Sequence, residues 1–206
     1  MNKIILSGEV VGAICYSHET RDEKFYIFYL SSERQSGTKD VVPCIVSEVF
    51  LSQIENNKQC KIKVVGEVRT RNAHVSSGKT RLEIFVFVKE ILEYESEDEN
   101  SVCIEGYICK PTSFRGTPLG REICDILVAS NREHNNKSDY IPCIAWGRNA
   151  KRTSLVEVGC KVFAKGRLQS REYTKINNEG EKEERTAYEL SLNYIEIGGT
   201  KDVDED

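Results

Sequence analysis

The sequence predicts an all-β chain of two similar five-stranded barrels in tandem, each with one short helix. Three observations support this prediction. The second half repeats the residue order of the first, each half has five segments rich in β-forming residues, and a helix-like segment recurs at the same place. Of the 206 residues, 39% are hydrophobic and 30% charged, which suits packed cores with a hydrated surface.

The internal repeat rests on matched residues that keep their order along the chain. Their separation grows from 98 to 100 residues, which indicates small loop insertions. The matched pairs are Asn2 and Asn100, Gly8 and Gly106, Ser32 and Ser130, Arg34 and Arg132, Pro43 and Pro142, Cys60 and Cys160, Gly66 and Gly166, and Arg71 and Arg171. We therefore expect domains at residues 1–94 and 100–199, an acidic linker at 95–99 and an acidic tail at 200–206.

Each copy places its helical segment between the third and fourth strands. The expected strands of the second copy are Ser101–Cys109, Glu122–Ser130, Asp139–Trp146, Lys161–Tyr173 and Ala187–Ile197. The expected helices are Val49–Asn57 and Arg148–Val158, the second closed by Gly159. This order is typical of the oligonucleotide/oligosaccharide-binding (OB) fold, a five-stranded Greek-key barrel. A generic small β-barrel is the competing fold.

Two segments of the second copy divide their side chains between two chemistries, because successive strand residues face opposite sides. In the first segment the apolar face holds Ile141, Cys143 and Ala145, and the outward face holds Tyr140, Pro142, Ile144 and Trp146. In the second, the outward residues are Lys161, Phe163, Lys165, Arg167, Arg171 and Tyr173. Aromatic rings among cations suit single-stranded nucleic acid, whose bases stack and whose phosphates are anionic. The alternative is that these rings pack in an interface or a second core.

The net charge of -4 is unevenly distributed along the chain. Residues 1–94 carry +1 and residues 100–199 carry +2, whereas the linker carries -4 and the tail -3. Two slightly basic domains therefore remain. This balance is too mild to establish nucleic-acid binding, since the arrangement of charge matters more than its total.

The eight cysteines and three histidines show no ligand-like spacing, so we expect buried free thiols and no metal, with a disulfide or a metal site as the alternative. No nucleophile setting or phosphate-binding glycine loop is present, and we expect neither an enzyme nor a cofactor. No apolar run nears the roughly 20 residues of a membrane span, and no signal-peptide pattern follows Met1. We expect a cytoplasmic protein without a membrane partner.

The second copy resembles the bacterial single-stranded DNA-binding protein (SSB) family over roughly Asn100 to Gly198. Four blocks in family order carry the resemblance, at residues 111–120, 128–132, 139–147 and 165–173. It implies a nucleoid-associated barrel that binds single-stranded DNA without strong sequence preference and protects it in replication, recombination and repair. It places Trp146, Tyr140 and Tyr173 at base-stacking positions, and His134 at a further position that is often aromatic.

The two copies differ in what they offer to DNA. In the second copy we expect phosphate contacts from Arg115, Arg132, Arg148, Lys151, Lys165, Arg167 and Arg171, with a merely solvated surface as the alternative for each. In the first copy, Val41, Ser47 and Ala73 replace the three stacking aromatics, so we expect assembly or weak tracking. Its remaining cations offer weak phosphate contacts: Arg34, Lys63, Arg69, Arg71, Lys79 and Arg81.

The resemblance also implies partners. Family barrels work four at a time, which implies a homodimer of this two-barrel chain. The tail Lys201–Asp206 lacks the family's apolar tip, so recruitment of genome-maintenance proteins, solubilisation and competition with DNA stay open for it. We expect Asn177–Arg185 to form a mobile hairpin tip. The rival function is a protein-interaction adaptor of a replication or restart complex with weak DNA binding, favoured by the tail and by Val41 and Ile45, which we expect to be exposed.

Overall fold

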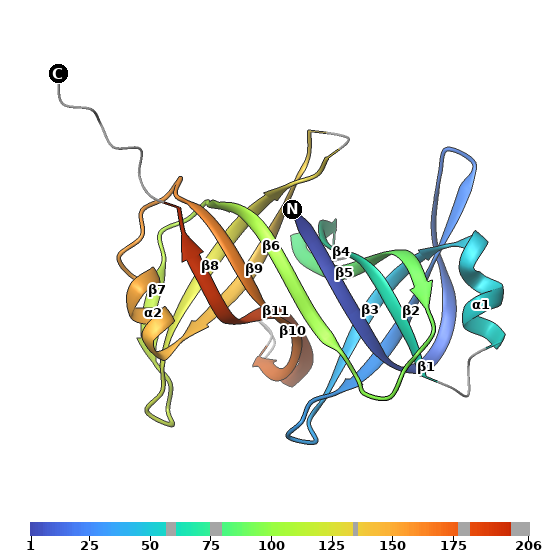
Figure 1. Cartoon of the computed structure of the whole chain (residues 1–206), viewed down its shortest axis with the longest axis horizontal. Helices are drawn as coiled ribbons and strands as arrows, with labels where there is room; N and C mark the ends of the chain where they lie inside the picture. Colours follow the sequence, from blue (N-terminus) through green and yellow to red (C-terminus); the bar gives the residue numbers. More distant parts are fainter. Residues whose placement is uncertain (57–60, 75–79, 134–135, 177–181, 199–206) are drawn as a thin grey trace.

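The computed structural model describes residues 1–56, 61–74, 80–133, 136–176 and 182–198. Two barrels lie side by side with β1 and β6 adjacent at their junction (Figure 1). The N-terminal barrel comprises β1 (Asn2–Thr20), β2 (Glu23–Glu33), β3 (Lys39–Ser47), the 3-10 turn η1 (Glu48–Phe50), α1 (Leu51–Asn56), β4 (Lys61–His74) and β5 (Thr80–Leu92). The C-terminal barrel comprises β6 (Asn100–Ile108), β7 (Ser113–Gly116), β8 (Glu122–Asn131), β9 (Ser138–Trp146), α2 (Gly147–Thr153), β10 (Lys161–Ile176) and β11 (Lys182–Ile197).

Each barrel closes through one parallel strand pair. In the N-terminal barrel, β1 pairs antiparallel with β2 and β4, and the ring closes where β3 runs parallel to β5. In the C-terminal barrel, β6 pairs antiparallel with β8 and β10, and β9 runs parallel to β11. The helices α1 and α2 lie at opposite far ends of the molecule (Figure 1). This topology confirms the predicted fold class of two tandem five-stranded barrels, each with one short helix.

The predicted second helix was too long. It ends at Thr153 rather than Val158 because side-chain hydroxyls compete for the carbonyls of its last turn. The Thr153 Oγ1 donates to the Asn149 carbonyl at 2.9 Å, and the Ser154 Oγ donates to the Lys151 carbonyl at 2.8 Å. These local bonds favour a turn over continued helix.

Two strand segments were also missed. The short strand β7 pairs with β8 and forms a hairpin inside a block that we had used only for the family resemblance. The segment expected as a mobile tip is strand over residues 182–185, because β10 and β11 stay paired to Ile176 and Lys182. Residues 177–181 lie outside the described ranges.

The inward strand faces form one apolar core that continues across both barrels. Ile4 of β1 lies opposite Val102 of β6, and both side chains are fully buried. Leu6 and Ile104 on the same strands are also fully buried, so the junction carries core rather than surface. Each such side chain contributes roughly 1.5 to 3 kcal/mol when it leaves water.

Glycines at matching positions let neighbouring strands approach closely. Gly66 and Gly166 each follow a register shift against the next strand, at Val65 and Lys165. A Cβ on either glycine would lie 2.2 Å from a backbone carbonyl oxygen of that strand. Only a hydrogen atom fits there, which explains why this residue type recurs in both copies.

The contact between the barrels is repeated on both sides of the Ile4–Val102 pair, because the register of β1 and β6 is symmetric about it. In one half, Asp139 accepts hydrogen bonds from the Thr70 backbone N–H at 2.6 Å and from the Arg132 guanidinium at 2.7 Å. In the other half, Asp40 accepts from the Ser170 backbone N–H at 2.9 Å and from the Arg34 guanidinium. Both carboxylates are fully buried, and each joins its own barrel to the other.

The two halves of this junction differ in charge. Hydrogen bonding to Asp139 raises the pKa of Arg132, and Glu67 adds a smaller favourable charge interaction. The matching position beside Arg34 holds Arg167, whose pKa is lowered by burial first and by the Arg34 charge second. We therefore expect the half that contains Arg34 to depend more strongly on its aspartate.

The acidic linker is fastened to the N-terminal barrel. Asp98 accepts hydrogen bonds from the Lys61 ammonium and from the Glu33 backbone N–H, both at 2.8 Å. Although burial opposes it, these bonds lower the pKa of Asp98. Glu99 forms an ion pair with Lys63 at 2.9 Å. Much of the linker's negative charge is thus paired within the barrel that precedes it.

Substituting Gly166→Ala should lower the free energy of unfolding by about 1 to 3 kcal/mol, because the new methyl group overlaps the Ser191 carbonyl. Denaturant unfolding of the full chain measures this change. Gly116→Ala is the matched control, since its Cβ would meet no atom within 4 Å. Equal effects from the two variants would contradict the close-approach argument.

Asp40→Asn should destabilise the chain more than Asp139→Asn. Either change leaves an arginine without its counter-charge. We expect the free energy of unfolding to fall by about 2 to 4 kcal/mol. This is less than the loss of about 3 to 5 kcal/mol for a fully buried pair, because both arginines keep some contact with water. The loss at Asp40 is larger because Arg34 then faces Arg167. Paired urea titrations decide the order, and a larger loss at Asp139 would refute it.

Candidate nucleic-acid interface

The outward surface of β8 to β11 in the C-terminal barrel forms the candidate interface. The predicted alternation of β9 is confirmed on its inner side, where Ile141, Cys143 and Ala145 are buried. On its outer side Tyr140 is 48% exposed, and Trp146 is half-buried. Their separation along the strand corresponds to about 20 Å. The two rings are therefore separate platforms rather than one aromatic cluster.

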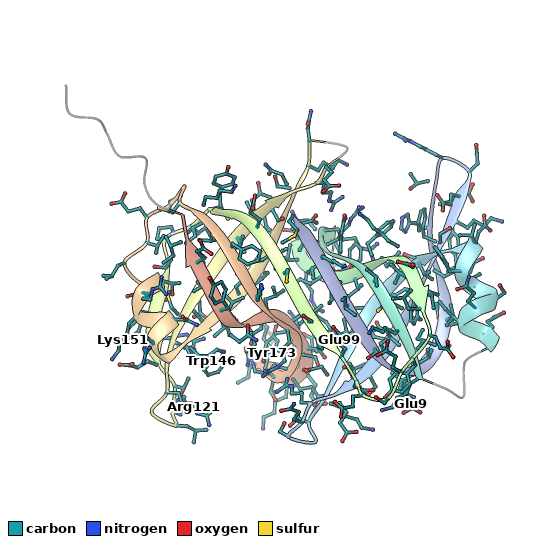
Figure 2. The ribbon with its side chains drawn as sticks, in the orientation of Figure 1. Glu9, Glu99, Arg121, Trp146, Lys151 and Tyr173 are labelled. Atoms are coloured by element: carbon teal, nitrogen blue, oxygen red, sulfur yellow. The ribbon has the colours of Figure 1, made fainter. Side chains whose placement is uncertain are left out.

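Trp146 lies where β9 ends and α2 begins. Its indole Nε1 donates a hydrogen bond to the Ser191 Oγ of β11 at 3.0 Å. This bond fixes the ring against the sheet while part of it stays open to solvent. In Figure 2, Trp146 and Lys151 lie at the same end of the barrel.

Ile144 was expected on the outward face of β9, and the structure covers it there. Its side chain points outward, yet only 6% of the residue is exposed. In the sheet it lies between Asp125 and Ser191, and the Trp146 indole is bonded to that same serine. The neighbouring strands and the hydrogen-bonded Trp146 indole therefore cover Ile144, which would be exposed on an isolated strand.

Tyr173 provides a third exposed ring, on β10, with 36% of the residue exposed. The guanidinium of Arg171 lies 5.7 Å from its ring centroid, and the same cation lies 3.8 Å from the Glu189 carboxylate. Glu189 also accepts a hydrogen bond from the Gln169 amide at 2.8 Å. The sequence reasoning missed this half-buried carboxylate in the middle of the face.

Four of the expected cations are available at the surface. Arg115 is paired with Asp125, Lys151 with Glu122, and Arg171 with Glu189, and in each pair the cation is exposed. Arg148 is exposed at the start of α2. Ion pairs open to water contribute little stability, so a phosphate can replace the carboxylate at small cost.

The other expected cations serve different roles. Arg132 and Arg34 are held by the junction aspartates, and Arg132 also donates to the Thr70 carbonyl at 3.2 Å. Lys165 lies 5.5 Å from the ring of Phe163, on the sheet face shared with β6. Arg167 keeps a buried Nε that has no hydrogen-bond partner among the described residues. His134 and Lys79 lie outside the described ranges.

The N-terminal barrel carries aromatics that the sequence reasoning missed. At the matched positions Val41 is exposed, Ser47 is buried and Ala73 is half-buried, as expected for the loss of those rings. The same outward face nevertheless holds Phe25, Phe85 and Phe87. The alternating phenylalanines of β5 were the signal that a comparison of matched positions overlooked.

These rings are bracketed by cations. The Arg69 guanidinium lies 4.1 Å from the Phe87 ring centroid, and the Arg71 guanidinium lies 5.6 Å from that of Phe85. Arg69 and Arg71 are also paired with Glu67 and Glu83. Cation–aromatic contacts of this kind orient both groups on a surface.

Ile45 was expected to be exposed, and this was wrong. It is almost fully buried, in a small cluster with Phe25 and Phe85. The larger rings of β2 and β5 close over it from both sides of β3. The apolar surface that favoured an adaptor function is thereby reduced to Val41.

The profile of the Single-strand binding protein family matches residues 99–197, which is nearly the whole C-terminal barrel. This match confirms, over the C-terminal barrel, the resemblance to the single-strand binding protein family that its sequence blocks indicated. Proteins of this family are not enzymes, which confirms the expectation against catalysis. The single-stranded DNA-binding protein of Oceanobacillus iheyensis is 29% identical over 80 residues, covering 36% of this chain and 50% of that protein. This chain thus spans about half the length of that curated family relative.

Solved structures extend the family likeness to the fold of both barrels. The wild-type single-stranded DNA-binding protein from Thermus aquaticus has a TM-score of 0.70 at 17% identity, covering 100% of this chain and 97% of that chain. A deletion mutant of the same Thermus aquaticus protein has a TM-score of 0.71 at 17% identity, covering 100% of this chain and 98% of that chain. At this identity the match shows a shared two-barrel fold.

The described part of the chain holds no cluster of three or more metal-ligating side chains. Its cysteines are free, and burial raises the pKa of the Cys44 and Cys143 thiols well above the ordinary value. Cys60 lies outside that part. Within the same residues, no helix is long and apolar enough to cross a membrane.

Proposed function

We propose that this protein binds single-stranded DNA without strong sequence preference and so protects it during replication, recombination and repair in the bacterial cytoplasm, in association with the nucleoid. The observation that carries the proposal is the set of open rings of Tyr140, Trp146 and Tyr173 on a barrel of the single-strand binding protein family. Stacking tolerates any sequence because every base has an aromatic face.

The expected energies suit this function. One base stacked on an aromatic ring contributes roughly 1 to 3 kcal/mol, so three platforms supply roughly 3 to 9 kcal/mol. A dissociation constant of about 1 μM corresponds to about 8 kcal/mol. Stacking thus supplies a large share of a useful affinity, and the exposed cations Arg115, Arg148, Lys151 and Arg171 add phosphate contacts that salt weakens.

Oligothymidylate should quench the emission of Trp146, the only tryptophan, and Tyr140→Ala should weaken binding by about 5- to 150-fold, the loss of one stacked base. A fluorescence titration of the full chain measures both. Tyr16→Ala is the control, because this exposed tyrosine lies on β1 of the other barrel. Unchanged emission at saturating DNA would count against the assigned face.

Two chains are expected to assemble as a homodimer with four barrels. The proposal is supported by the outward face of the sheet around β1 and β6, where Ile5 and Phe163 are half-buried and Tyr107 and Tyr194 are exposed. Apolar residues that cluster on one face favour burial in an interface. Light scattering over a range of concentrations should give twice the chain mass, and a monomer at all concentrations would contradict this arrangement.

A protein-interaction adaptor remains the second candidate function, and Val41 and the acidic tail are the features that favour it. Its support has weakened because Ile45 is buried and the Val41 backbone N–H already donates to the Ser170 Oγ at 3.0 Å, at the barrel junction. A gel shift separates the two functions, since an adaptor should not shift single-stranded DNA at micromolar protein. Recruitment of genome-maintenance proteins by the tail stays a proposal, as residues 199–206 lie outside the described part.

A further inference from the structure

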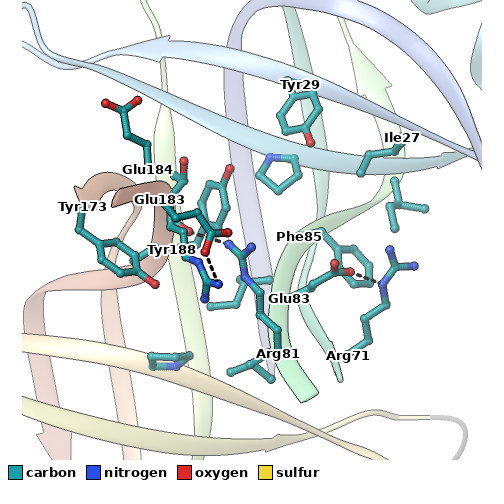
Figure 3. Close-up of a pocket in the computed structure, with 18 residues that line it drawn as sticks. Ile27, Tyr29, Arg71, Arg81, Glu83, Phe85, Tyr173, Glu183, Glu184 and Tyr188 are labelled. Carbon is teal, nitrogen blue, oxygen red and sulfur yellow. Dashed lines mark hydrogen bonds and ion pairs between the residues drawn. The ribbon is translucent and has the colours of Figure 1, made fainter. Parts of the chain in front are cut away.

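A groove of about 590 Å³ lies between the outward faces of the two barrels (Figure 3). Tyr29, Phe85 and Arg81 line it from the N-terminal barrel, and Tyr173 and Tyr188 line it from the C-terminal barrel. Its volume falls within the about 300 to 1,000 Å³ typical of small-ligand sites, a class that includes nucleotides. One of its rings, Tyr173, is already assigned to DNA binding by the proposed function.

We propose that this groove binds nucleotides of the same DNA strand that lies on the C-terminal barrel, and leads that strand onto the N-terminal barrel. The inference rests on the proposed function, because the strand must first occupy Tyr140, Trp146 and Tyr173. It assigns the N-terminal barrel a base-binding role at residues other than the matched positions Val41, Ser47 and Ala73.

The groove has aromatic rings on both walls. Tyr29 is 38% exposed on β2, and Tyr173 is comparably open on β10. Tyr188 is half-buried, and its pKa is raised first by burial and then by the nearby Tyr29. That influence crosses the junction, so the rings of the two barrels are near neighbours. A base that enters the groove can stack on either wall.

Three arginines and three glutamates line the groove, and one of these arginines has no carboxylate bonded to it among the described residues. Two of its arginines are already paired, Arg71 with Glu83 and Arg185 with Glu183. Arg81 differs, since its guanidinium donates to the Thr186 carbonyl at 3.1 Å and forms no ion pair with any carboxylate in the described ranges. It reaches into the middle of the groove in Figure 3. Glu183 is close enough to feel the Arg81 charge but is bonded to Arg185, so a phosphate would give Arg81 the direct counter-ion that it lacks among the described residues.

One hydrogen-bond donor among the groove residues lacks an acceptor. The Nε of Arg185 is buried and has no hydrogen-bond partner among the described residues. Buried donors are normally satisfied, so an unpaired one among the residues that line the groove is consistent with an acceptor from a ligand. The carboxylate of Glu184, which also lines the groove, points away from these side chains in Figure 3.

Phe85 makes the route continuous. It belongs both to the groove and to the aromatic cluster of Phe25 and Phe87 on the N-terminal barrel. A strand that leaves Tyr173 would therefore pass Arg81 and Phe85 before it meets the Arg69–Phe87 pair. The path consists of rings and guanidinium groups, the pair of groups that single strands require.

The test compares oligothymidylates of two lengths on the full chain. One OB barrel covers about 4 to 16 nucleotides, so a strand of about 8 nucleotides stays on the C-terminal barrel and one of about 30 nucleotides reaches the N-terminal barrel. Tyr29→Ala and Arg81→Gln should bind the short strand like the unchanged protein and bind the long strand about tenfold more weakly, the loss of one stacked base or one phosphate contact.

Matched variants keep the test specific. Tyr16→Ala and Lys24→Gln remove a tyrosine and a cation of the same barrel outside the groove, and should leave both affinities unchanged. Tyr29→Phe keeps the ring and should retain the long-strand affinity. Tyr29 is a surface residue, so its replacement should leave the barrel folded, and thermal unfolding of each variant checks this.

Two results would overturn the inference in distinguishable ways. If Tyr29→Ala and Arg81→Gln leave long-strand affinity unchanged while Tyr140→Ala weakens the short strand, the groove has no role and the proposed function stands. If neither length binds, or Tyr140→Ala has no effect on the short strand, the proposed function fails and the groove inference fails with it.

Discussion

The antiparallel pairing of β1 with β6 determines how every other surface of this protein is arranged. It makes one continuous core of two barrels and sets their outward faces on either side of a shared groove. Two buried aspartates stabilise this arrangement, each accepting hydrogen bonds from a backbone N–H of the opposite barrel. A charge buried in this way is tolerated only when it is fully hydrogen-bonded, so the relative placement of the barrels is specific.

The junction between the barrels also positions Tyr140 of the candidate interface. Asp139 precedes Tyr140, and the Tyr140 backbone N–H donates to the Thr70 Oγ1 at 3.0 Å. The N-terminal barrel therefore holds the strand that presents the exposed Tyr140 ring, even though Thr70 belongs to the divergent copy. Loss of aromatics at matched positions did not free that copy from its structural role, because each half of the junction needs residues from both barrels.

Charge pairing explains why a chain with net negative charge still has exposed cations on the proposed DNA interface. The acidic linker neutralises Lys61 and Lys63 on the N-terminal barrel, away from the C-terminal interface. On that interface, Arg115 and Lys151 pair with exposed carboxylates that water and phosphate can displace. The distinction between usable and committed cations therefore depends on burial, as the contrast between Arg115 and the buried pair of Arg132 shows.

The sequence by itself determined the repeat, the barrel topology and the outward placement of Tyr140, Trp146 and Tyr173, because alternation and residue spacing are local properties. Only the tertiary structure decided which outward residues are open and which cations are committed. Ile45 and Ile144 face outward but are covered by neighbouring strands, and Arg34 and Arg132 are held by aspartates that lie between the barrels. Exposure and pairing depend on residues distant in sequence, so no single strand could reveal them, nor the groove that joins Tyr29 to Tyr173.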